Sequence, residues 1–286
     1  MKTSLKNTRR AIFSVMVLCL AFMFTPISEV KAASNDNIQA VAAVFDSAYY
    51  AAMYPDVAAR ANGDPLYLLN HYAKIGIYEG RNASGSFNAS DYMTKNPDLY
   101  ALYGDNLIAY VYHYVHMGKA EGRDATPSVG AGIEVPNQYT LLGVYATEYD
   151  PAAARATNIS IAASHVNGTV VAPGKTFSAS NTIGPRTSAN GFVNAPVFIN
   201  KEHAMGLGGG VCQVSSTIYA ALRMSGIPAT ERHAHSLPVN YLPAGWDATI
   251  SWGSLDMKFA NPYDHNIVVF MQADNGILTA ALYLEN

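Results

Sequence analysis

The strongest candidate for chemistry is Cys212, which lies in the run Gly-Leu-Gly-Gly-Gly-Val-Cys-Gln-Val-Ser-Ser-Thr at residues 206–217. Apolar residues recur after it at helical spacing and Gly226 ends the pattern, so the sequence predicts a helix over about residues 212–225. The thiol then lies at the helix N-terminus, where unpaired backbone N–H groups and the helix dipole stabilise an anion. This setting favours the thiolate, which is the nucleophilic form of cysteine.

Three residues could complete a catalytic set with this thiol. The predicted helix carries the chain roughly 20 Å away, and a strand of about six residues is expected to return it to Glu-Arg-His-Ala-His at residues 231–235. Because strand side chains alternate, His233 and His235 share one face and either could act as the base. Asp247 opens a second expected strand beside the first. Cysteine, histidine and aspartate therefore occur as a possible nucleophile, base and orienting carboxylate.

The same region supplies candidates for substrate binding. Gly208, Gly209 and Gly210 let backbone amides approach a substrate closely, and their N–H groups, with that of the cysteine, could hold an oxyanion. Gln213 follows the cysteine directly and is a further candidate. Arg186 could bind a substrate carboxylate through its planar guanidinium, although a structural ion pair explains it equally well.

A zinc site is an alternative use of these side chains. Cys212, His233 and His235 are an acceptable ligand set, which Asp247 or His203 could complete. An exported zinc site with one thiolate is less usual, so we expect neither a metal nor another cofactor.

Other polar residues near the cysteine have simpler explanations. The hydroxyls of residues 215–217 could be nucleophiles, but bonding to local backbone accounts for them. Asp256 could replace Asp247 as the carboxylate, but its context, Ser-Leu-Asp-Met-Lys, is first that of a turn.

The N-terminus has the pattern of a secretory signal peptide over residues 1–33, with a basic start, an apolar run and Val-Lys-Ala before the expected cleavage site. The apolar run is shorter than the ~20 residues of a membrane span, and no later segment approaches that length. Cleavage would leave 13 basic and 20 acidic residues, which argues against nucleic acid as a partner. It would also leave Cys212 as the single cysteine, which cannot form an internal disulfide. The signal-peptide pattern predicts a secreted, extracellular or cell-wall-associated protein.

An internal repeat precedes the cysteine region. Phenylalanine, Pro-Asp, His-Tyr and Glu-Gly-Arg motifs recur 42 residues apart, in segments 44–84 and 86–126. We expect two small helical units whose tyrosines mostly form their core and whose repeated histidines are structural. A flexible linker over residues 127–137 would lead to a second domain over 138–286. The predicted fold class is α+β, with an N-terminal all-α repeat domain and a C-terminal domain in which a helix presents the cysteine against an antiparallel sheet.

Residues 167–198 and 206–269 closely resemble the VanW family of bacterial envelope proteins. The most specific motifs are Gly-Gly-Val-Cys-Gln-Val-Ser-Ser-Thr and His-Ser-Leu-Pro-Val. The family is named for an accessory protein of glycopeptide resistance clusters, so the resemblance implies a connection to cell-wall peptidoglycan. The N-terminal repeats are similar to those of bacterial secreted and surface proteins.

A looser resemblance relates the cysteine region to transglutaminase-type and papain-like thiol enzymes, which use cysteine, histidine and aspartate in this chain order. It implies Cys212 as nucleophile, His235 or His233 as base and Asp247 as the carboxylate that fixes the imidazole tautomer. The function expected from both resemblances is a thiol hydrolase or acyltransferase acting on peptidoglycan peptides. The alternative is a non-catalytic peptidoglycan-binding or scaffolding protein in which the thiol is buried and inert.

Overall fold

The computed structural model describes residues 35–199 and 202–286, which belong to one compact unit. The predicted signal peptide lies outside the described residues. Helices and antiparallel strands both contribute, so the α+β fold class is confirmed. In the described part of the chain, no helix combines the length and the apolar character needed to cross a membrane.

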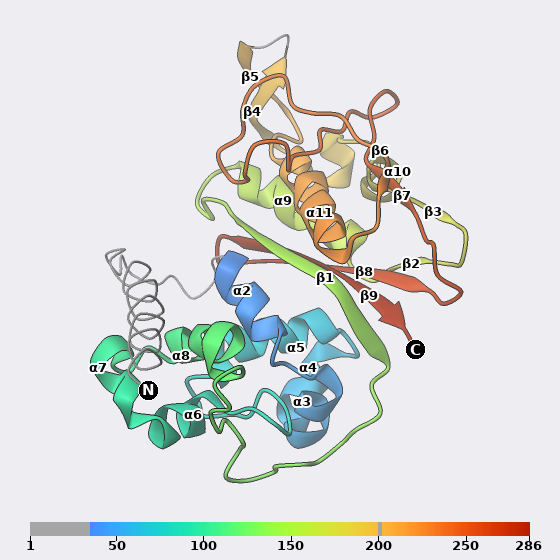
Figure 1. Cartoon of the computed structure of the whole chain (residues 1–286). Coiled ribbons are helices and arrows are strands. Elements are labelled where there is room, and N and C mark those ends of the chain that lie inside the picture. The colour runs from blue at the N-terminus through green and yellow to red at the C-terminus, as the bar shows by residue number, and fades with distance from the viewer. Residues whose placement is uncertain (1–34, 200–201) are drawn as a thin grey trace, which may run out of the picture. The chain divides into compact units, whose positions relative to one another are not determined.

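A four-stranded antiparallel sheet organises this unit, with strand order β1-β9-β8-β2 (Figure 1). The strands β8 and β9 form a hairpin through the two-residue turn Asn275 and Gly276, both of which have positive φ, as a type I′ turn requires. The bounds of the strands are β1 (Tyr139–Glu148), β2 (Thr169–Val171), β8 (Ile267–Asp274) and β9 (Ile277–Glu285).

Both faces of this sheet are buried, and the alternation of side chains along β8 explains how. Val269 and Met271 point to one face and pack with helices α9 (Arg155–Val166) and α11 (Val211–Ser225). Val268 and Phe270 point to the other face and pack against the N-terminal helices. The two cores are therefore separated only by the sheet.

The N-terminal helices form two segments with equivalent contacts. Tyr50 Oη and His71 Nδ1 lie 3.0 Å apart, and 42 residues later Tyr92 Oη and His113 Nδ1 lie 2.9 Å apart. These histidines are therefore hydrogen-bonded structural residues. The helices are α2 (Asn35–Ala42), α3 (Ser47–Met53), α4 (Pro55–Ala61), α5 (Pro65–His71), η1 (Tyr72–Gly76), α6 (Ala89–Lys95), η2 (Pro97–Leu99), α7 (Tyr100–Tyr103), α8 (Leu107–His113) and η3 (Tyr114–Gly118).

Polar contacts fix the first helical segment to the sheet. Lys74 Nζ lies 2.8 Å from Asp274 Oδ2, and Asn70 Nδ2 donates to Gln272 Oε1 at 2.6 Å.

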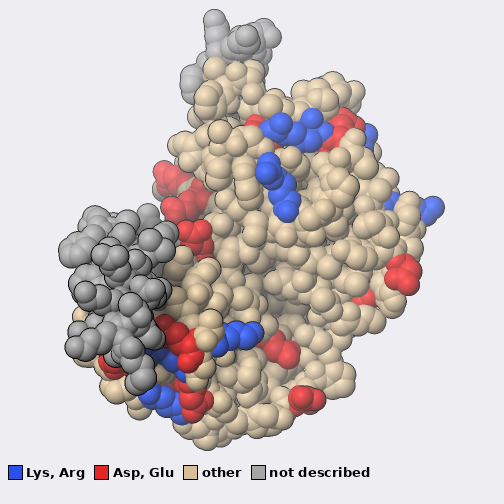
Figure 2. All heavy atoms as spheres, in the orientation of Figure 1, with Lys and Arg blue, Asp and Glu red and all other residues tan. Residues whose placement is uncertain are grey.

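On the face shown in Figure 2, the acidic and basic side chains of the described residues are interspersed.

The connection over residues 127–137 differs from the expected flexible linker. Tyr49 Oη donates to the Gly130 carbonyl at 2.9 Å, Asn82 Nδ2 donates to the Val129 carbonyl at 2.7 Å, and Ser128 Oγ donates to Asp91 at 2.6 Å. Because side chains of both helical segments hold it, this connection follows their surface in a defined course.

The return from α11 also differs from the prediction. The strand after Pro228 has only three residues, β6 (Ala229–Glu231), and the segment beginning at Asp247 makes no regular ladder. A single backbone bond, from the Thr249 N–H to the His233 carbonyl at 2.8 Å, joins the two expected strands. The remaining elements are β3 (Thr176–Ser178), α10 (Ala179–Ile183), η4 (Ser188–Asn190), β4 (Asn194–Ile199), β5 (Glu202–Leu207) and β7 (Lys258–Ala260).

Replacing Phe270 with alanine tests the packing of the helical segments on the sheet. Phe270 is buried and makes edge contacts with Tyr139 and Tyr283, so truncation should lower the free energy of unfolding by about 3 to 5 kcal/mol. Urea denaturation measures this loss. The exposed Tyr78→Ala serves as control and should change stability by less than about 0.5 kcal/mol. A Phe270→Ala loss below about 1 kcal/mol would show that this face of the sheet is not packed.

Candidate active site

Glycines place Cys212 at the start of α11. Gly210 precedes the helix with φ of 106°, a conformation that glycine adopts without strain, and Cys212 is the second helical residue. Gly209 must also be glycine, because a Cβ there would lie 2.6 Å from the Pro196 carbonyl oxygen. The Gly209 carbonyl in turn accepts a hydrogen bond from Asn158 Nδ2 at 2.9 Å, which ties this loop to α9.

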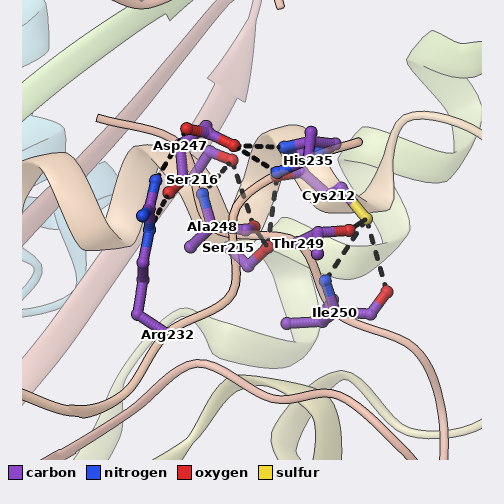
Figure 3. A network of polar contacts seen from close by, with 9 residues as sticks. All are labelled: Cys212, Ser215, Ser216, Arg232, His235, Asp247, Ala248, Thr249 and Ile250. Atoms are coloured by element: carbon purple, nitrogen blue, oxygen red, sulfur yellow. Dashed lines mark hydrogen bonds and ion pairs between the residues drawn. The ribbon is translucent and has the colours of Figure 1, made fainter. Parts of the chain in front are cut away.

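Cys212 is a partly buried residue, and its thiol faces the segment that follows Asp247 (Figure 3). Its Sγ lies 3.4 Å from Thr249 Oγ1 and 3.4 Å from the Ile250 carbonyl oxygen. The Ile250 N–H also donates to Sγ, at an N to S distance of 3.5 Å. A donor aimed at sulfur stabilises the thiolate.

His235 and Asp247 form a hydrogen-bonded pair beside this segment. His235 Nδ1 lies 2.7 Å from Asp247 Oδ2, and the same oxygen accepts the His235 backbone N–H at 2.7 Å (Figure 3). The side chains are 8% and 11% exposed, respectively. With Nδ1 held by the carboxylate, the imidazole keeps Nε2 for the thiol.

His233 does not lie with this pair. Its Nε2 lies 3.0 Å from Glu231 Oε1, and its side chain is 40% exposed. The expectation that both histidines share a strand face is wrong at this point, because residues 232–235 lie beyond the end of β6 and do not alternate as in a strand.

The pKa shifts at the site have opposite signs on sulfur and imidazole. Burial raises the pKa of the Cys212 thiol, but the influence of His235 and the contacts with Thr249 and Ile250 outweigh burial, so the pKa falls below its ordinary value. Burial lowers the pKa of His235, but the influence of the Cys212 thiolate and the hydrogen bond with Asp247 outweigh burial, so this pKa rises. Both shifts favour a thiolate beside an imidazolium.

Arg232 holds Asp247 in place and had no role in the sequence-based prediction. Its Nη2 donates to Asp247 Oδ1 at 2.8 Å and its Nε donates to the Asp247 carbonyl at 2.7 Å. Burial raises the pKa of Asp247, but hydrogen bonds from His235 and the charge of Arg232 lower it overall. The only sequence signal was a basic residue within the Glu-Arg-His-Ala-His motif.

The hydroxyls after the cysteine attach α11 to the aspartate segment. Ser215 Oγ donates to the Ala248 carbonyl at 2.6 Å, and Ser216 Oγ accepts the Ala248 N–H at 2.9 Å. The sequence predicts that these hydroxyls bond to nearby backbone. Their backbone partners include Ala248, which is more than thirty residues away in the sequence. These bonds hold Ala248 between Asp247 and Thr249, and thereby keep both close to the thiol.

Unpaired backbone donors occur in the glycine loop and at the first turn of α11. The N–H groups of Gly209, Gly210 and Cys212 have no hydrogen-bond acceptor among the described residues. A tetrahedral oxyanion on a carbon bonded to the thiol needs donors of this kind.

The predicted substrate-binding residue Gln213 has a structural role instead. It is 1% exposed, and its Nε2 donates to Thr147 Oγ1 at 3.0 Å and to the Glu148 carbonyl at 2.9 Å. Its Oε1 accepts from Arg155 Nη2 at 3.0 Å. Because these contacts use both amide hydrogens and the oxygen, Gln213 joins α11 to β1 and does not face a substrate.

The two remaining alternatives are not favoured by the geometry. Asp256 accepts hydrogen bonds from the backbone N–H groups of Ser180 and Met257 at 2.7 and 2.8 Å, and it has no hydrogen bond with His235. Among the side chains that the structure describes, no cluster of three histidine, cysteine or acidic residues could hold a metal ion. The side chain of His203 is not among them.

Residues 154–283 match the model of the family described as "VanW like protein". The chain therefore carries a VanW domain. Two curated relatives are similar to it: the uncharacterized protein YoaR of Bacillus subtilis, 38% identical over half of this chain, and the vancomycin B-type resistance protein VanW of Enterococcus faecalis, 26% identical over 41% of this chain. The matches span 47% and 45% of those proteins, so the chain corresponds to less than half of each. No solved structure matches.

The VanW domain contains the whole candidate site. Cys212, His235 and Asp247 all lie within the matched span, whereas the helical segments precede it. Strand β1 also precedes the matched span, although it pairs with β9 over most of its length.

Proposed function

We propose that the VanW domain is a thiol-dependent acyl-transfer enzyme. The observation that carries the proposal is the His235–Asp247 pair, in which Nδ1 and Oδ2 lie 2.7 Å apart, together with the lowering of the Cys212 thiol pKa by this imidazole. Cys212 is the nucleophile, His235 transfers protons at Nε2, and Asp247 fixes the imidazole tautomer.

The reaction follows from this arrangement. The thiolate attacks the carbonyl carbon of an amide, and the unpaired backbone N–H groups beside the thiol stabilise the oxyanion. The imidazolium gives its proton to the leaving amine nitrogen, the C–N bond breaks and a thioester forms. A water then loses a proton to the neutral imidazole and adds to the thioester. The C–S bond breaks, which releases the carboxylic acid and restores the thiolate; an amine in place of the water gives acyl transfer.

The substrate we propose is a peptide of cell-wall peptidoglycan, and the place of action is the cell envelope. The signal-peptide pattern over residues 1–33 supports export, and a peptide amide outside the cell fits the reaction. One relative is named for vancomycin resistance, which supports a role in the wall. The helical segments, which lie outside the VanW match, would be an accessory repeat domain of a surface protein.

The state of the Cys212 thiol tests this proposal without knowledge of the substrate. Because the thiol pKa is lowered, the rate of alkylation by iodoacetamide should rise with pH through a midpoint well below the free-thiol value of about 8.5. Peptide mass spectrometry would assign the adduct to Cys212 and separate it from any adduct on Cys19.

His235→Gln supplies the comparison variant. It removes the imidazole that lowers the thiol pKa, so the midpoint should move up towards or beyond the free-thiol value. A wild-type thiol that stays unreactive across this pH range would support the non-catalytic scaffold and contradict the enzyme.

A further inference from the structure

Arg186 is a half-buried guanidinium with very few partners. Its Nη1 donates to Ser180 Oγ at a long 3.4 Å, and its Nη2 is buried without any hydrogen-bond partner in the described part of the chain. It forms no ion pair with a carboxylate among residues 35–199 and 202–286, whereas Arg81, Arg123 and Arg232 each have one at 3.2 Å or less.

This arrangement is unfavourable for a cation. A charge removed from water is normally compensated by a counterion or by a full set of hydrogen bonds. Burial lowers the pKa of Arg186, which expresses the same penalty, and the negative charges of Cys212 and Asp256 only partly oppose it. An anion bound at this position would remove the penalty.

The position of Arg186 relates it to the thiol. Its side chain lies against Gly208, where a Cβ would be 2.6 Å from Arg186 Cγ. Gly208 begins the glycine loop that reaches Cys212 four residues later. The charge of the Cys212 thiolate acts on this guanidinium, which agrees with the placement of Arg186 against the loop.

We propose that Arg186 binds a carboxylate of the substrate close to the carbonyl that Cys212 attacks, so that the site selects peptides with a free carboxylate next to the reacting bond. The planar guanidinium can hold a carboxylate through two parallel N–H donors. Ser180 Oγ accepts from Arg186 Nη1, and its own O–H would be a further donor to such a carboxylate. The proposal deepens the proposed function and rests on Cys212 as its nucleophile.

Two small alkylating reagents test this selectivity directly. Iodoacetate carries a carboxylate and iodoacetamide carries a neutral amide, while both place the same CH₂–I group before the sulfur. The thiolate displaces iodide in each case and forms a C–S bond. The ratio of the two rates, divided by the same ratio for free cysteine, isolates the recognition of the carboxylate from the reactivity of the thiol.

In wild type, this normalised ratio should favour iodoacetate by about tenfold or more, as one charge-assisted contact implies. Arg186→Gln should bring the ratio to about one while iodoacetamide still reacts, and Arg186→Lys should keep part of the preference because it keeps the charge without the fork. Lys119→Gln removes one exposed charge on the helical segments and should leave the ratio unchanged.

The outcomes separate the two proposals. A thiol that reacts readily with both reagents at a normalised ratio near one in wild type overturns the carboxylate subsite and leaves the thiol enzyme intact. A ratio that stays high in Arg186→Gln also overturns the subsite. A thiol that reacts with neither reagent overturns the enzyme and the subsite together.

Discussion

Replacing Cys212 with alanine is expected to reduce the release of products from peptidoglycan fragments on the order of 10⁴-fold or more. The side chain supplies the only atom that forms a covalent bond with the substrate in the proposed reaction, and nothing nearby can replace it. The neighbouring hydroxyls are not substitutes, because Ser215 and Ser216 are buried and bonded to the Ala248 backbone. Liquid chromatography with mass spectrometry would measure both the products and the thioester on the enzyme.

The control for this variant is Met224→Ala on the same helix. Met224 is exposed near the end of α11, remote in sequence from the thiol, so its truncation should leave the rate within about twofold. Circular dichroism should show both variants folded. Product release by Cys212→Ala at the wild-type rate would refute the nucleophile and support a scaffold.

Asp247→Asn should have the second-largest effect, a loss of about 10³-fold or more in kcat. The two carboxylate oxygens of Asp247 accept hydrogen bonds from Arg232 Nη2 and from the His235 backbone N–H and Nδ1. In asparagine, an NH₂ group replaces one of these two oxygen acceptors. If this NH₂ group faces His235 Nδ1, then Nδ1 must accept its hydrogen bond and the imidazole proton moves to Nε2. A protonated Nε2 can no longer accept a proton from the thiol or from water.

The pH dependence of this variant has a defined sign. The wild-type ion pair exists between the lowered pKa of the thiol and the raised pKa of His235. Loss of the carboxylate lowers the imidazole pKa, because burial lowers this pKa and Asp247 no longer raises it. The imidazolium is then less stable, so it stabilises the thiolate less and the thiol pKa rises. The pH range of activity should therefore narrow, because its lower limit rises with the thiol pKa and its upper limit falls with the imidazole pKa. A profile of kcat/KM against pH would measure both limits.

Asp264→Asn is the matched control, since the same chemical change falls on a side chain that is 94% exposed. It should alter neither the rate nor the pH profile. An Asp247→Asn profile that coincides with wild type would show that the carboxylate does not act on the imidazole.

The parts of this site that the sequence predicted depend on local chemistry. The glycine loop, the following helix and the position of Cys212 at its start are encoded within about twenty residues, by backbone freedom and apolar spacing. The helix was predicted to begin at about residue 212 and begins at Val211. The contact between Asp247 and one of the two histidines was likewise predicted from residue type and order.

The parts that the sequence did not predict depend on distant partners. His235 and His233 are equivalent in type and nearly in position, and only the early end of β6 directs one to Asp247 and the other to Glu231. Gln213 follows the nucleophile, but its amide bonds to β1, more than sixty residues earlier. Such contacts have no signal in a single sequence, because hydrophobic period and turn residues describe neighbours along the chain.

The same limit explains the linker. Its composition is that of a flexible connection, yet its carbonyl groups accept hydrogen bonds from Tyr49 and Asn82 on the first helical segment. Proline and glycine reduce the local tendency to form helices or strands. They do not prevent the backbone from being held by side chains that lie elsewhere.

The place of β9 in the sheet bears on how the protein is made. Strands β1 and β8 are both neighbours of β9 and not of each other, and β9 is the last of the three in the chain. While residues 277–285 are still inside the ribosome, β1 has no strand to pair with. Both hydrophobic cores then lack the β9 side chains that complete the sheet between them. Chains released before residue 285 would therefore lack the strand that joins the thiol site to the helical segments, and synthesis must pass this point before the sheet can close.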